Sequence, residues 1–167
     1  IRGRLTAING QPVVTAVTKD SEDSGDESLN RELNLTVSET LPKGNDLIEG
    51  DWWNTPAIAP WPVSVESRLA ERLGLGLGDK LTFTLAEGDV EAIVSSLRKV
   101  DWDSFQPNFY MVFPPAALAA FPASYLTAFH VPNERRDILN TLVKRFPTIV
   151  LIDVDAIMTQ IRTLLDD

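Results

Sequence analysis

The stretch Ser67–Leu85, SRLAERLGLGLGDKLTFTL, carries much of the fold information in this chain. Its first seven residues have apolar side chains at helical spacing, which predicts a short helix whose apolar side is made by Leu69, Ala70 and Leu73. Gly74 follows where helices commonly end in a left-handed residue, and Leu75 can fold back onto the helix. The last six residues alternate, which predicts a strand with three inward side chains, Leu81, Phe83 and Leu85.

The glycines of this stretch, together with Lys80 and Thr82, invite a nucleotide-binding interpretation. A phosphate loop requires Gly-Lys-Ser/Thr, but here Asp79 separates Gly78 from Lys80. A dinucleotide fingerprint requires Gly-x-Gly-x-x-Gly, and the spacing here is Gly-x-Gly-x-Gly. Phosphate loops also lead from a strand into a helix, whereas this loop leads from the negative end of a helix into a strand. The sequence therefore predicts a structural turn.

Outward from this stretch, alternation and apolar runs predict further elements. The segment Glu87-Gly88-Asp89 turns the chain, and Val90–Val100 returns as a partner strand. Other strands are expected at Ile1–Ile8, Arg31–Glu39, Phe109–Phe113, Tyr125–Val131 and Thr148–Ile152. Helical spacing predicts helices over Glu134–Phe146 and Val154–Leu165, with a short helix or turn at Pro115–Phe121. The acidic, serine-rich run Lys19–Asn30 predicts a solvated loop.

Composition narrows the class of function. The chain has 167 residues, 44% of them hydrophobic and 23% charged, with a net charge of −9. This charge argues against a nucleic acid or an anionic bilayer as the main partner. The absence of cysteine excludes disulfides and thiol chemistry, and the single histidine, His130, excludes a histidine-rich metal site. The most apolar region, Met111–Phe129, contains three prolines and cannot form one continuous spanning helix.

The candidate catalytic groups form weak patterns. Asp101 and Asp103 could serve as paired acid and base, but adjacent acids at the end of a strand are typical of a turn cap. A Ser-His-Asp triad would need His130, which lies in a strand pattern, and the sequence has no Gly-x-Ser-x-Gly elbow.

Four tryptophans in a small chain pose a separate alternative. They could fill the core, or they could form a hydrophobic contact surface beside the prolines of residues 56–62. Trp53 and Trp61 are the candidates for such an interaction surface.

The stretch Val63–Pro115, VSVESRLAERLGLGLGDKLTFTLAEGDVEAIVSSLRKVDWDSFQPNFYMVFPP, resembles the MacB-like periplasmic core domain of FtsX-like ABC transporter permeases. The shared elements are a short helix ending in Leu-Gly-Leu, then Gly-Asp, then a strand hairpin. Within it, RKVDWDSFQPNFYMVFPP is similar to the second large extracytoplasmic domain of YbbP-type permeases. The ends of the chain, IRGRLTAINGQPV and RFPTIVLIDVDAIMTQI, fit the same group, so the resemblance covers nearly the whole chain.

This resemblance implies an α+β fold with two lobes. Residues 1–50 and 116–167 would form an α/β sandwich, porter-like lobe, and residues 51–115 an inserted β-rich lobe with one short helix. Both ends of the chain would continue into transmembrane helices. The domain would lie on the periplasmic, extracytoplasmic side of a bacterial inner membrane.

The resemblance also implies a function. The domain would relay ATP-driven movement from a separate cytoplasmic ATPase, or engage a substrate or partner, in the export of a lipid, lipoprotein or other hydrophobic substrate. It would need no catalytic residue, cofactor or metal. A helix joined to the membrane would couple the movement through Ile157, Ile161 and Leu164. An envelope protein-binding module using Trp53 and Trp61, and a hydrolase using Asp101 and Asp103, are the alternatives.

Overall fold

The computed structural model describes residues 1–13, 32–54, 56–104 and 106–165, with side-chain burial given up to residue 160. The chain divides into two compact units, Ile1–Ala128 and Phe129–Asp167. The predicted solvated loop at Lys19–Asn30 lies outside the described residues. Within the described residues, no helix is both long and apolar enough to cross a membrane.

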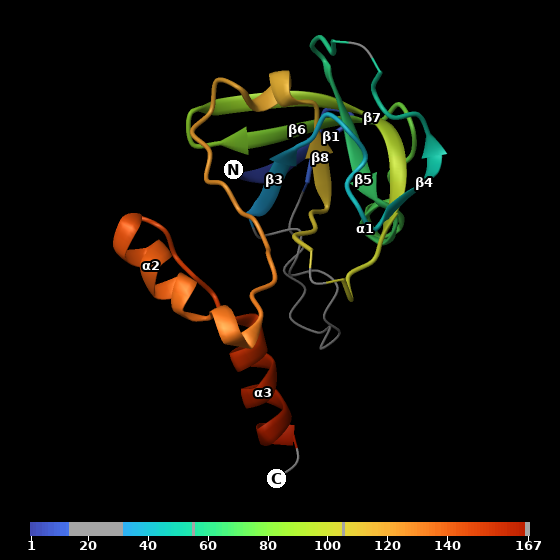
Figure 1. Ribbon diagram of the computed structural model, residues 1–167. Coiled ribbons are helices and arrows are strands. Elements are labelled where there is room, and N and C mark those ends of the chain that lie inside the picture. The colour runs from blue at the N-terminus through green and yellow to red at the C-terminus, as the bar shows by residue number, and fades with distance from the viewer. Residues whose placement is uncertain (14–31, 55, 105, 166–167) are drawn as a thin grey trace, which may run out of the picture. The chain divides into compact units, whose positions relative to one another are not determined.

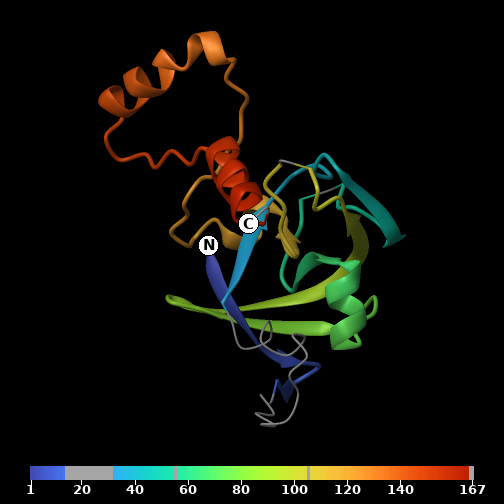
Figure 2. The same cartoon turned by 90° about the horizontal axis from the view of Figure 1, so that it is seen from below.

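The first unit is built on a closed barrel of six strands (Figures 1 and 2). In order around the barrel, each pairing with the next, these are β1 (Arg2–Ile8), β3 (Leu33–Val37), β8 (Met111–Phe113), β5 (Trp61–Glu66), β7 (Gly88–Val100) and β6 (Lys80–Leu85). The ring closes because β6 pairs with both β7 and β1. Two pairs, β3 with β8 and β5 with β7, are parallel, and the other four are antiparallel.

Two short strands extend the barrel sheet at its sides. β2 (Gln11–Pro12) forms a hairpin with β1, and β4 (Asn45–Gly50) pairs with β7. The β1–β2 turn is formed by Asn9 and Gly10, both with positive φ, as a two-residue hairpin of this type requires.

The barrel interior follows from strand alternation. Leu81, Phe83 and Leu85 of β6 point inward as predicted, and residues of β7 meet them from the adjacent strand. Phe83 contacts Phe113 of β8 edge-on, with ring centroids 5.5 Å apart. The fully buried side chains of β5, Val63 and Val65, complete the same core.

Short helices cover part of this core. Helix α1 (Ser67–Leu73) has the bounds predicted, and its Leu69 and Ala70 are buried. After β8, a 3₁₀ turn, η2 (Pro115–Leu118), buries Ala117 and Leu118. Together these contacts give the first unit a continuous apolar core.

The predicted two-lobe division is not confirmed by this arrangement. β1, β3 and β4, from residues 1–50, form one sheet with strands from residues 51–115. The closure of the barrel thus uses strands from both predicted lobes, residues 1–50 and 51–115. Packing of residues 1–50 against residues 116–167 stays a prediction.

The second unit contains a 3₁₀ turn, η3 (Asn133–Arg135), and two helices, α2 (Asp137–Arg145) and α3 (Val154–Leu165). Helix α3 has the predicted bounds, and α2 is shorter than predicted. The runs Tyr125–Val131 and Thr148–Ile152, predicted as strands, are not strands in the structure. A strand needs a neighbour for its backbone hydrogen bonds, and neither run has one among the described residues.

Candidate functional site

The glycine loop after α1 is held as a structural turn. Gly74 has φ of 65° and donates its amide to carbonyls of the last helical turn, and Leu75 is buried behind it. The Asp79 carboxylate accepts from the Gly76 amide at 2.7 Å and from Asn9 Nδ2 at 2.9 Å. These bonds occupy the carboxylate at the tip of the loop, so the prediction of a structural turn is confirmed.

Hydrogen bonding in this loop also sets the charge of Asp79. The bond from Asn9 is the larger cause and the bond from the Gly76 amide the second cause of a lowered pKa for the Asp79 carboxyl. Asn9 in turn accepts from the Lys80 amide at 2.8 Å. The side chain of Asn9 therefore joins the β1–β2 hairpin to the start of β6 through hydrogen bonds.

The two carboxylates considered for catalysis lie in a turn. Asp101 Oδ1 accepts from the Asp103 amide at 3.1 Å, and the Asp101 carbonyl accepts from the Ser104 hydroxyl at 2.7 Å. Asp103 is exposed. His130 belongs to the second unit and is also exposed. The turn-cap interpretation of Asp101 is confirmed. Across the described ranges, no cluster of three or more metal-ligating side chains is arranged to hold an ion.

A buried arginine lies at the end of the barrel nearest this turn. Arg98 of β7 is fully buried, and its guanidinium donates to Asn45 Oδ1 at 3.0 Å and to the Phe109 carbonyl. Its register partner on β5 is Glu66, which is 2% exposed and caps α1 by accepting from the Leu69 amide at 2.7 Å. Arg98 Nε has no partner among the described groups. From β7, one cation thus hydrogen-bonds β4 and the segment before β8, beside the buried carboxylate of Glu66 on β5.

Burial lowers the pKa of Arg98 to about 10, and the charge of Glu66 opposes that shift. The guanidinium therefore stays charged at neutral pH. No sequence motif marks this group, although the alternation of β7 contains the signal. Arg98 shares its side of the strand with Val94, Ser96 and Val100, all of which are buried.

The loop after β7 displays an aromatic pair on this framework. The rings of Trp102 and Tyr110 contact each other with centroids 4.8 Å apart and planes inclined by 45°, and Trp102 is 40% exposed. Asn108 Nδ2 donates to the Asp101 carbonyl at 3.0 Å, and Asn45 Nδ2 donates to Asn108 Oδ1 at 3.2 Å. The loop that carries the pair is thus braced by hydrogen bonds that lead through Asn45 to Arg98.

The tryptophans predicted to form an interaction surface are half-buried. Trp53 stacks on Trp52 with ring centroids 3.9 Å apart, and Trp53 Nε1 donates to the Ser38 carbonyl at 3.0 Å. Trp61 packs against the barrel core and lines an open groove of about 670 Å³. The groove combines apolar side chains, including Pro60, Trp61 and Phe121, with charged ones, Lys80, Asp89 and Glu91. An interaction role for Trp53 and Trp61 stays a prediction.

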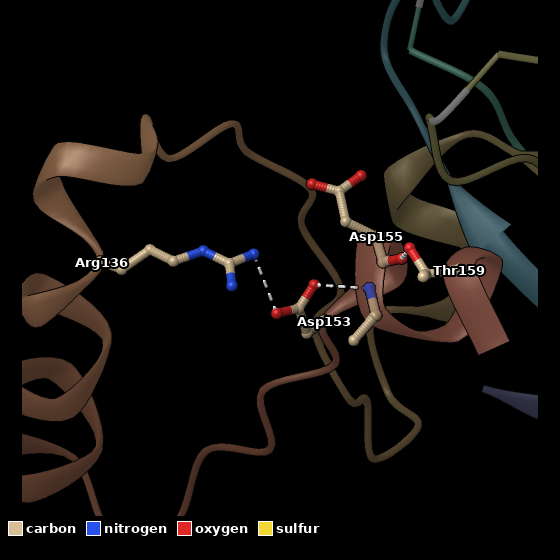
Figure 3. Close-up of polar contacts among 5 residues, drawn as sticks. Arg136, Asp153, Asp155 and Thr159 are labelled. Carbon is tan, nitrogen blue, oxygen red and sulfur yellow. Dashed lines mark hydrogen bonds and ion pairs between the residues drawn. The ribbon is translucent and has the colours of Figure 1, made fainter.

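The residues predicted to couple movement lie on α3, whose start is fixed by polar contacts (Figure 3). Asp153 Oδ1 accepts from the Ala156 amide at 3.1 Å, the geometry of a helix N-cap. Its other oxygen lies 3.1 Å from Arg136 Nη2, just before α2. Thr159 Oγ1 donates to the Asp155 carbonyl at 2.8 Å within the helix. The Asp153 carboxylate therefore caps the start of α3 and forms an ion pair with Arg136, the residue before α2.

The predicted coupling residues are only partly described. Ile157 is 46% exposed, so its side chain has an incomplete apolar surrounding in this chain. Ile161 and Leu164 lie within α3, but their side chains are outside the described residues. Their predicted role stays a prediction.

These arrangements define a class of protein: an α+β domain whose described polar side chains cap turns, cap helices and brace a barrel. The chain is similar, at 45% identity over 161 residues, to the uncharacterized ABC transporter permease YbbP of Escherichia coli (strain K12). The alignment covers 96% of this chain and 18% of that permease. The predicted resemblance to a YbbP-type ABC transporter permease domain is confirmed. No family model and no solved structure matches the chain.

Proposed function

We propose that this chain is an extracytoplasmic domain of an ABC transporter permease and that it transmits ATP-driven movement without chemistry of its own. The similarity to a YbbP-type permease over nearly the whole chain carries this proposal. The chain spans only 18% of that relative. We therefore also propose, as parts of the same function, the flanking membrane helices, a separate cytoplasmic ATPase and a periplasmic location. The exported substrate would be a lipid, a lipoprotein or another hydrophobic molecule.

A relay of movement needs stiff structure both in the barrel and at helix α3, and each has features that support it. A closed barrel with a packed core transmits displacement because its interior has little free volume. Helix α3 begins at a capped residue, Asp153, which also pairs with Arg136. A tilt of α3 would therefore move the residues before α2 rather than unwind the helix.

The relay can be tested without knowing the substrate. Spin labels at Glu87 and Gln160, both exposed, would report the distance between barrel and α3 in the full-length permease with its ATPase. We expect the distance distribution to change on ATP binding and to stop changing in an Ile157→Asp variant. Ile58→Asp, at another exposed isoleucine in the barrel unit, is the matched control and should respond as the unaltered protein does. An unaltered response in Ile157→Asp would contradict the relay.

A second candidate function is capture of an envelope protein or lipid substrate, favoured by the groove beside Trp61. Aromatic and apolar side chains next to charged ones are typical of binding surfaces. Trp61→Ala should weaken retention of such a partner at least about tenfold, as expected for a central aromatic contact. Trp102→Ala, which removes an exposed tryptophan outside the groove, is the control. Equal loss in both variants would reject the groove as the binding surface.

A further inference from the structure

The turn between β1 and β2 holds an asparagine with a chemically reactive neighbour. Asn9 is followed by Gly10, and no other asparagine in the 167 residues precedes a glycine. Asparagine is among the side chains that heat degrades. A following glycine favours this degradation, because a residue without a Cβ atom leaves its amide nitrogen open to approach the asparagine side chain. The sequence of this turn is therefore that of a deamidation site.

Deamidation at this turn passes through a cyclic imide. The backbone nitrogen of Gly10 forms a bond to Asn9 Cγ, and the Cγ–Nδ2 bond breaks. The leaving nitrogen takes up the proton of the Gly10 amide and departs as ammonia. Water then opens the imide at one of its two carbonyls, which leaves aspartate or isoaspartate at position 9. The reaction uses only groups of the turn and solvent water.

The folded chain engages both polar atoms of the Asn9 side chain. Asn9 Nδ2 donates to Asp79 Oδ1 at 2.9 Å, and Asn9 Oδ1 accepts from the Lys80 amide at 2.8 Å. The Asn9 backbone amide also donates to the Lys80 carbonyl at 2.7 Å. The two side-chain bonds oppose the reaction, because ring closure draws Cγ toward the Gly10 nitrogen and removes Nδ2, the donor to Asp79.

The two partners also determine what a carboxylate at position 9 would meet. The Asp79 carboxylate can only accept a hydrogen bond, and the Lys80 amide can only donate one. A carboxylate at position 9 could still accept from Lys80, but it has no hydrogen to give to Asp79. Two negative charges would then meet where a charge-assisted hydrogen bond now stands.

We propose that Asn9 is a deamidation site whose reaction is slowed by its contacts with Asp79 and Lys80, and that its conversion to a carboxylate weakens the pairing of β1 with β6. This pair closes the barrel, and Ile8 lies opposite Leu81 directly beside the turn. The conversion does not reverse once ammonia has left, so altered chains accumulate with time. All of these residues lie in the first unit, so the inference depends neither on the second unit nor on the proposed function.

Peptide mass spectrometry of the aged 167-residue chain tests the effect of the contacts on the reaction. Cleavage after Arg4 and Lys19 releases a peptide in which Asn9 is the one asparagine, and fragment ions assign the amide-to-acid mass change to it. We expect folded Asp79→Ala to deamidate at least about tenfold faster than the unaltered chain, because a hydrogen bond to a charged acceptor is lost.

Glu87→Ala is the matched control, since it removes one exposed negative charge from the turn after β6 without touching Asn9. Its deamidation rate should stay within about twofold of that of the unaltered chain. An unchanged rate in folded Asp79→Ala would overturn the proposal, and so would a slower rate, which would mean that the Asp79 carboxylate promotes the reaction. If Asp79→Ala does not fold, the unaltered chain in urea should react at least about tenfold faster than when folded. Equal rates in these two states would overturn the proposal as well.

The consequence of the conversion is measured with Asn9→Asp by urea unfolding at neutral pH. Its unfolding equilibrium constant should exceed that of the unaltered chain at least about tenfold, because two like charges replace a hydrogen bond. In an Asp79→Ala background, the same substitution should change the constant by less than about twofold, because the second charge is gone. An Asn9→Asp chain as stable as the unaltered one, or an equal loss in both backgrounds, would contradict the proposed effect on the β1–β6 pairing.

Discussion

At the scale of single residues, Arg98 occupies an inward position of β7 that strand alternation would fill with an apolar side chain. Its bonds reach Asn45 of β4 and the Phe109 carbonyl, and its charge faces Glu66 of β5. Removal of a buried charge leaves its hydrogen-bond partners without a donor and nearby buried charges without compensation. The contribution of Arg98 is thus to fix which segments meet at this end of the barrel.

Arg98→Met should therefore destabilise the isolated chain by roughly 1 to 3 kcal/mol, because Asn45 Oδ1 and the Phe109 carbonyl would lose their buried donor and the buried Glu66 a nearby positive charge. The midpoint of urea unfolding measures this loss. Lys99→Met, at the exposed neighbouring position, should cost less than about 0.5 kcal/mol. Adding Glu66→Gln to Arg98→Met should restore part of the stability. A fully stable Arg98→Met variant would show that the cation has no structural role.

The carboxyl of Asp79 allows a test by pH. Its pKa in the folded chain is lowered from 3.8 because Asn9 and the Gly76 amide bond to the ionised form. A group with a lowered folded pKa stabilises the protein above its unfolded pKa, and this stabilisation is lost as pH falls through the folded pKa. In Asn9→Gly, which keeps the positive φ of the turn accessible, the Asp79 pKa should rise toward 3.8. Carbon-detected NMR titration measures it, and an unchanged pKa would refute the role of Asn9.

At the scale of elements, β4 depends on one backbone position. Gly50 ends β4 with φ of 76°, and a Cβ atom there would collide with the Ser95 carbonyl oxygen of β7. Gly74 ends α1 with a similar φ of 65°, but a Cβ atom there would meet open space. The two glycines share a left-handed conformation and differ in their surroundings.

Alanine substitution at these two positions separates strain from steric clash. Gly74→Ala should cost about 1 kcal/mol, the penalty of a left-handed alanine. Gly50→Ala should cost clearly more, because β4 must also move away from β7. Thermal unfolding of the two variants gives the comparison. Equal losses at both positions would mean that β4 is free to shift, contrary to its pairing with β7.

At the scale of the whole molecule, local patterns predicted several helices and strands but not which strands pair, and the strands expected at Tyr125–Val131 and Thr148–Ile152 did not form. Strand β6 could be predicted from the alternation of Leu81, Phe83 and Leu85. Helix α1 could be predicted from its apolar spacing and the cap at Gly74. Closure of the barrel depends on pairs such as Leu5 with Phe83, which are far apart in sequence and leave no local signal. The inward position of Arg98 was available from alternation, but its partners Asn45 and Phe109 were not.

The apolar core of the first unit predicts that this unit is stable on its own. Burial of apolar surface is the main favourable contribution to folding, and the described core lies entirely within residues 1–128. A chain truncated after Ala128 should unfold cooperatively with an extrapolated free energy of unfolding within about 10 to 15% of that of the longer chain, which is the uncertainty of the extrapolation. Limited proteolysis should likewise cleave the 129–160 region first and leave the barrel intact. A truncated chain that fails to fold would show that the second unit packs on the barrel strongly enough to stabilise it, and would favour the predicted lobe of residues 1–50 with 116–167 over an independent barrel.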